Sequence, residues 1–97
     1  MTMHDGDILV TTVDDALIRN DEMLVLVGSE VMLLSVVSTE IARVCAGGLT
    51  LGELGDHLFS VFGPPLDGSR VGERTRVLVA ELVEAGILRV ASAPQDM

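Results

Sequence analysis

The sequence predicts an α+β domain with a winged-helix-like arrangement, in which a three-stranded antiparallel sheet is followed by three helices. Three observations carry this prediction. Short β-rich runs separated by turn residues fill the first third of the chain, apolar residues recur at helical spacing in the rest, and glycine or proline follows each helical segment. The 97 residues suit one domain, with a core that we expect over about residues 8–90.

The first third of the chain is predicted to form short strands. Residues 1–7 are polar and expected to be loose, and the run ILVTTV over 8–13 has strand character until Asp14 and Asp15 interrupt it. The pattern leaves open whether 8–19 is one bent strand or two pieces. Strands at about 16–19, 23–27 and 30–34 form the antiparallel meander, with a hairpin turn at Gly28-Ser29.

Two of these strands are apolar on both faces. The run 23–27 is apolar throughout, which predicts a central strand covered on both faces. In the third strand Leu33 and Leu34 are adjacent, so apolar side chains point to both faces there as well. A single layer of helices covers only one face, so the third strand has one apolar face more than such a layer can cover.

The first two helices have clear boundaries. Ser35 can cap a helix that begins near Val36 and ends at Gly47-Gly48, and Thr50 and Glu53 form a capping box for a second helix that ends at Gly63 and two prolines. The side chains expected to face the core are Val37, Ile41, Val44 and Cys45 from the first helix, and Leu51, Leu54, Leu58, Val61 and Phe62 from the second.

The third helix is expected over 70–85, between a cap at Ser69 and a stop at Gly86. Its core-facing stripe comprises Val71, Thr75, Leu78, Val79 and Leu82. One flank carries Arg74, Val77 and Glu81, and the other Arg76 and Val83. Ile87 and Leu88 can fold back on the core, and 89–97 is expected to be a frayed tail.

Charge and composition narrow the classes of partner. Six arginines and no lysine stand against fifteen acidic residues, a net charge of −9, which repels nucleic acid and anionic lipid. Neither a signal peptide nor a membrane span is recognisable, and a single cysteine suits a reducing compartment, so the expected location is the cytoplasm. Cys45 is expected to be a buried core thiol.

The chain lacks the residue groupings of an enzyme. His4 and His57 are the only imidazoles, no Cys/His metal spacing or nucleophile motif is present, and no lysine completes a phosphate-binding loop. His57 lies between apolar positions, which favours a structural role. We therefore expect no catalytic activity, no metal and no cofactor.

An ordered series of motifs resembles a known family. The series runs Leu33-Leu34-Ser35, then IARVCAG over 41–47, LTLGEL over 49–54 and LVEAGIL over 82–88. It is similar to the PqqD family and to the related precursor-peptide recognition elements of ribosomally made, modified peptides. Ser35 replaces the usual Asn, and Ala46-Gly47-Gly48 replaces the usual Asp-Gly. The resemblance covers about residues 16–88.

The resemblance implies a stand-alone domain that binds the leader segment of a precursor peptide and presents it to a leader peptidase or another modifying enzyme, as in lasso-peptide systems. The leader would add as a strand beside the third strand, in a cleft walled by the third helix. The residues expected to bind it are Glu30, Val31, Met32, Leu33, Leu34, Arg74, Val77, Leu78 and Glu81.

Two alternative functions remain open at the level of sequence. A structural or dimerisation module would use the third strand to pair with a second copy. A winged-helix DNA-binding domain would use the third helix, where Arg70, Arg74 and Arg76 suit it, but Glu73, Glu81 and Glu84 on the same helix and the net charge disfavour it.

Overall fold

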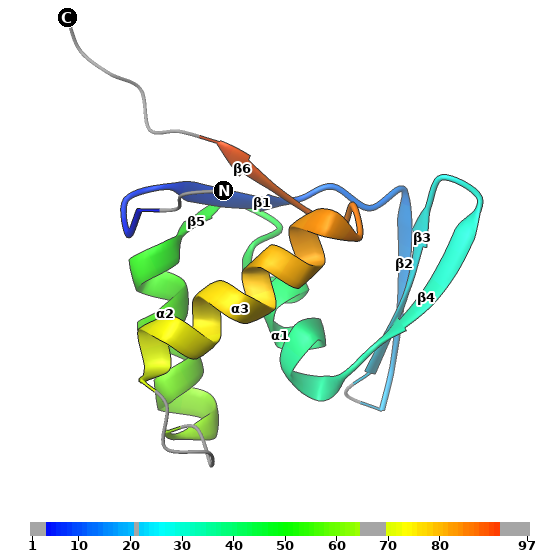
Figure 1. The fold of residues 1–97 in the computed structure, drawn as a ribbon. Helices are drawn as coiled ribbons and strands as arrows, with labels where there is room; N and C mark the ends of the chain where they lie inside the picture. Colours follow the sequence, from blue (N-terminus) through cyan, green and yellow to red (C-terminus); the bar gives the residue numbers. More distant parts are fainter. Residues whose placement is uncertain (1–3, 21, 65–69, 92–97) are drawn as a thin grey trace, which may run out of the picture.

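The chain forms an α+β fold with two three-stranded antiparallel sheets and three helices (Figure 1). A computed structural model describes residues 4–20, 22–64 and 70–91. The strands are β1 (Ile8–Thr11), β2 (Asp15–Arg19), β3 (Glu22–Val27), β4 (Glu30–Leu34), β5 (Leu49–Thr50) and β6 (Leu88–Ala91). The helices are α1 (Val36–Val44), α2 (Leu51–Phe62) and α3 (Val71–Glu84).

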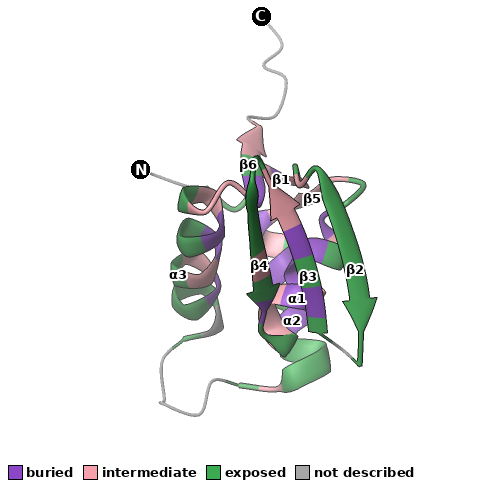
Figure 2. Cartoon of the chain, turned by 90° about the vertical axis from the view of Figure 1, so that its right-hand side faces the viewer, coloured by how far each residue is buried: buried purple, intermediate pink, exposed green. Residues whose placement is uncertain are grey.

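The predicted meander is confirmed as the sheet β2–β3–β4, with β3 in the centre. The prediction that β3 is covered on both faces is wrong. Met23 and Val25 are buried on the inner face, but Leu24 on the outer face is 36% exposed. All three helices lie on the inner side of this sheet, which leaves the outer face without a covering layer among the described residues (Figures 1 and 2).

A second sheet, β5–β1–β6, was not predicted from the sequence. It decides the question left open at 8–19, because β1 and β2 are separate strands in different sheets. Residues 89–91, expected in a frayed tail, instead pair with β1, where Val90 lies opposite Leu9. Residues 92–97 lie outside the described part of the chain.

The predicted caps of α1 and α2 are confirmed. The Ser35 side chain accepts a hydrogen bond from the Ser38 amide, and Thr50 and Glu53 form the capping box. The start of α2 is also bound by residues expected to be loose, since the backbone carbonyls of Asp7 and Asp5 accept from the Leu51 and Gly52 amides, each at 2.9 Å. The amino-terminal segment is therefore part of the fold from residue 4 onward.

The ends of α2 and α3 depart from the prediction in detail. Val61 and Phe62 are 52% and 42% exposed, because the last turn of α2 extends beyond the core rather than over it (Figure 1). The helix α3 begins after Arg70, which makes no side-chain cap. Ser69 and the side chain of Val71 lie outside the described part.

The core lies between the inner face of β3, the three helices and β1. Its fully buried side chains are Leu9, Val25, Ile41, Cys45, Leu54, Val79 and Ile87. Thr75 is also buried, as predicted for the core-facing stripe of α3. Gly86 ends this helix with φ 81, and a Cβ there would lie 3.0 Å from Val27 Cγ1, so the carboxyl end of α3 abuts the end of β3.

Candidate peptide-binding edge

The hairpin that joins β3 to β4 is a tight two-residue turn. Gly28 adopts φ 62, the positive angle that a type II′ turn requires at its first central residue. Its amide donates to Asp14 Oδ2 at 2.8 Å, which anchors the turn to the segment before β2. The turn sets the register, with Val27 opposite Glu30 and Leu24 opposite Leu33.

This register decides which backbone groups of β4 are open. The two residues that flank a two-residue hairpin turn form a hydrogen-bonded pair, and bonded and non-bonded pairs alternate along an antiparallel ladder. Glu30, Met32 and Leu34 therefore bond to β3. The amides and carbonyls of Val31 and Leu33 point to the opposite side, which is the outer edge of the sheet.

The other edge of the sheet, β2, is more protected. By the same alternation its outward amides belong to Ala16 and Ile18. The Ala16 amide donates to Asp15 Oδ1 at 2.8 Å, so one of the two is already bonded. Within the described residues, no hydrogen bond reaches the outward groups of Val31 or Leu33, and β4 is thus the edge better prepared to accept another strand.

The side chains predicted to bind a peptide from β4 divide between the two faces. Val31 and Leu33 are 67% and 63% exposed on the outer face, as the excess of apolar residues predicted. Met32 is half-buried and Leu34 is buried, because both point inward to the core, while Glu30 is exposed. Leu34 therefore offers no side-chain surface to a ligand.

The helix α3 lies beyond the open edge of β4, on the side opposite to β3 (Figure 2). Of its predicted binding residues, Arg74, Val77 and Glu81 are exposed and Leu78 is half-buried. Arg76, on the other flank, donates to Asp5 Oδ1 at 2.9 Å, so that flank faces the amino-terminal segment. The opposite flank, with Arg74, Val77 and Glu81, points away from that segment, and Leu78 lies next to it in the core-facing stripe.

Titratable groups outside β4 and α3 have structural roles. Glu40 on α1 accepts hydrogen bonds from Arg43 and from His57 on α2, which gives His57 the structural role expected of it. Burial raises the pKa of the Cys45 thiol to about 11, so it is a protonated core residue, as predicted, at neutral pH. No cluster suited to hold a metal ion exists among the described residues.

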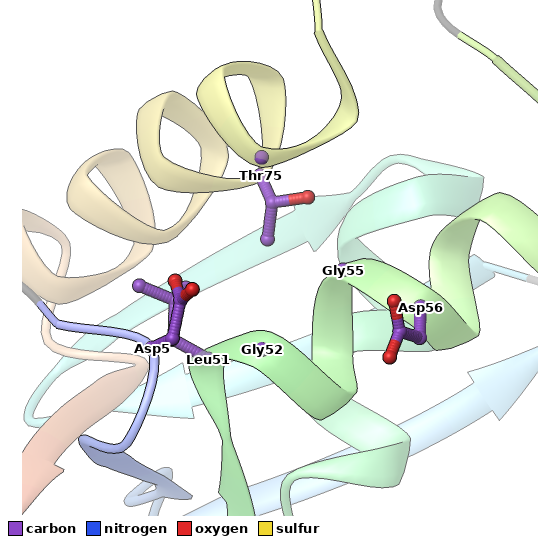
Figure 3. Close-up of a pocket in the computed structure, with 7 residues that line it drawn as sticks. Asp5, Leu51, Gly52, Gly55, Asp56 and Thr75 are labelled. Atoms are coloured by element: carbon purple, nitrogen blue, oxygen red, sulfur yellow. The ribbon is translucent and has the colours of Figure 1, made fainter.

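A hollow lies between α2 and α3 (Figure 3). Thr75 lies above Gly55, with Asp5 at one end and Asp56 at the other. Asp5 is bound to Arg76, and neither an imidazole nor a thiol reaches the hollow. This feature lies where α2, α3 and the amino-terminal segment meet, and its side chains form no catalytic grouping.

Sequence reasoning did not identify that residues of β4 bond alternately to β3 and to the open edge, which makes Val31 and Leu33 the outward pair, although the signal was present. A two-residue turn at Gly28-Ser29 already fixes which residues of the following strand bond inward. It also missed Asp15 as the group that protects β2, since the adjacent acids Asp14 and Asp15 were interpreted only as an interruption of the strand.

No helix in the described part is long and apolar enough to cross a membrane. Comparison with protein-family models, with curated proteins and with solved structures finds no significant match.

Proposed function

We propose that this chain binds the leader segment of a ribosomally made precursor peptide, as a strand added to β4, and presents it to a leader peptidase or another modifying enzyme. The observation that carries the proposal is the open edge of β4, with the outward backbone groups of Val31 and Leu33 free of partners among the described residues. Strand addition uses such groups for affinity and the neighbouring side chains for specificity.

The surroundings of this edge support the same function. The exposed flank of α3 with Arg74, Val77 and Glu81 would form the wall beyond the edge, next to the half-buried Leu78. Arg74 can pair with an acidic leader residue, and Glu30 or Glu81 with a basic one. The order of sheet β2–β3–β4 and helices α1–α3 also suits the winged-helix-like arrangement that the sequence predicts.

Amide hydrogen exchange tests the backbone part of the proposal. The first step is a search for a short precursor gene beside the gene for this chain, and the probe is the amino-terminal segment of the peptide that such a gene encodes. On its addition, the Val31 and Leu33 amides should become protected, whereas the Met32 amide should be protected already because it bonds to β3. Saturating leader that leaves Val31 and Leu33 in fast exchange would rule out strand addition at β4.

A pair of matched variants tests the helix wall. Val77→Asp places a charge on the exposed surface of α3, and we expect leader affinity to fall by about tenfold, or roughly 1.4 kcal/mol, because the carboxylate must lose water when the peptide binds. Val61→Asp makes the same change at a similarly exposed valine in the last turn of α2, a helix outside the proposed binding site. It should leave affinity unchanged. Fluorescence anisotropy with labelled leader measures both, and equal effects would contradict a role for α3.

A second candidate function is self-association, which the exposed apolar outer face of β2–β3–β4 favours. Two copies would then pair through β4 edges. Sedimentation equilibrium separates the two cases: the dimer predicts a mass twice that of one chain without any peptide, and the adaptor predicts a monomer that gains only the mass of the leader.

A further inference from the structure

The outer face of β2–β3–β4 is ordered in rows that run across the strands. Because residues opposite one another point to the same face, the register defines these rows directly. One row holds Leu17, Leu24 and Leu33, and the next holds Asp15, Leu26 and Val31. Leu17, Val31 and Leu33 are 60%, 67% and 63% exposed, so the apolar rows remain open where they reach β4.

A strand added to β4 must extend these rows. Its backbone would bond to the outward groups of Val31 and Leu33, and the residues opposite these two would therefore project to the outer face. This holds for either direction of the added strand, since neighbouring residues share a face in both. The residue between them would project inward, beside Met32 and toward α3.

From this geometry we infer that the segment bound by β4 carries two apolar side chains two positions apart, which pack on the outer face against Val31 and Leu33. The inference rests on the proposed function and specifies its substrate class as an apolar–x–apolar strand. Apolar cross-strand neighbours stabilise a sheet, and β-branched or aromatic ones do so best. Only two residues of β4 point outward, so the pattern requires two such positions.

The test uses synthetic peptides with a fluorescent label. One peptide of about eight residues, a usual strand length, carries two isoleucines two positions apart in a threonine background, and its partner carries serine at both positions. We expect saturable binding of the isoleucine peptide and at least fivefold weaker binding of the serine peptide, as two cross-strand contacts are lost.

Two variants in the same row locate the contact. Leu33→Thr removes an exposed apolar side chain at the open edge, and it should lower the affinity for the isoleucine peptide by about threefold to fivefold. Leu17→Thr makes the same change on β2, at nearly the same exposure but two strands away. It should change the affinity less than twofold. Because both side chains face water, neither variant is expected to unfold the chain.

The outcomes distinguish failure of the apolar–x–apolar inference from failure of the proposed function. If isoleucine and serine peptides bind equally, or if Leu33→Thr has no effect, the outer-face pattern is wrong while strand addition stands. Equal loss in Leu33→Thr and Leu17→Thr would place the peptide over the whole face rather than at the edge, which also overturns the inference. If neither peptide binds, the inference fails, and protection of Val31 and Leu33 by the natural leader decides separately whether the proposed function survives.

Discussion

At the scale of single residues, the carboxylate of Glu40 links two helices through its charge. Its carboxylate is 16% exposed and lies 2.6 Å from an Arg43 nitrogen and 2.5 Å from His57 Nε2, so it joins α1 to α2. The hydrogen bond from Arg43, followed by that from His57, holds the pKa of Glu40 below its ordinary value of 4.5. The folded state therefore prefers the ionised form.

This lowered pKa predicts how stability depends on pH. The stabilisation is complete above the pKa of the unfolded chain, near 4.5, and is lost as the pH falls through the lower folded value. Glu40→Gln should lower the free energy of unfolding by about 1 kcal/mol at neutral pH, and the difference from the unmodified protein should shrink below pH 4.5. Urea denaturation at several pH values measures it.

A matched control for Glu40 is Glu22→Gln, at an exposed carboxylate on β3. It should change stability by less than about 0.5 kcal/mol at every pH. A difference between Glu40→Gln and the unmodified protein that stayed constant from neutral to acid pH would show that ionisation of Glu40 is not what stabilises the contact.

At the scale of elements, some amides of β4 bond to β3 and others face the open edge. Substitution by proline, which has no amide hydrogen, distinguishes the two kinds. Val31→Pro removes a donor that faces the open edge, where proline is tolerated. Met32→Pro removes the donor to Val25 on β3 and leaves a carbonyl of the central strand without its partner. We expect Val31→Pro to abolish leader binding with little loss of stability, and Met32→Pro to cost on the order of 2 kcal/mol.

Thermal unfolding and anisotropy with labelled leader, measured on the same two variants, check this prediction. Val31→Pro that binds leader normally would mean that the outward amide of Val31 is not used. A similar loss of stability in both variants would mean that the alternation of bonded residues along β4 differs from the one that the turn implies.

The elements predicted most accurately are those with local signals. Ser35, the capping box at Thr50 and the turn at Gly28 each fix a boundary through neighbours a few residues away. The sheet β5–β1–β6 was missed because β1 finds its partners about forty and eighty residues further along the chain, as Leu9 pairs with Leu49 and Val90. No local pattern announces such a pairing.

The same distinction applies to the candidate site. The surplus of apolar residues on the third strand predicted an exposed face, and Val31 and Leu33 provide it. Which flank of α3 lies toward the amino-terminal segment was not predictable, because the contact that shows it joins Arg76 to Asp5, seventy-one positions apart. The exposure of Val61 and Phe62 was also not predictable. The apolar stripe of α2 continues through these two residues, although the core ends before them.

At the scale of the whole molecule, charge separates the proposed function from DNA recognition. The chain carries a net charge of −9. In the described part of the chain, two of the six arginines, Arg43 and Arg76, are paired with carboxylates. Arg74, the other arginine of α3, shares that helix with Glu73, Glu81 and Glu84. A helix of this composition offers no continuous basic surface to a phosphate backbone.

We therefore predict no binding of random duplex DNA at micromolar protein concentration, even in low salt, where counterion release favours association most. An electrophoretic shift assay across a salt series measures this. As a positive control for folded protein, the labelled leader should bind in the same buffer, and its affinity should depend less on salt because backbone pairing and apolar contacts supply it. A duplex shift that weakens steeply as salt rises would instead assign α3 to DNA, and the open edge of β4 would then need a different explanation.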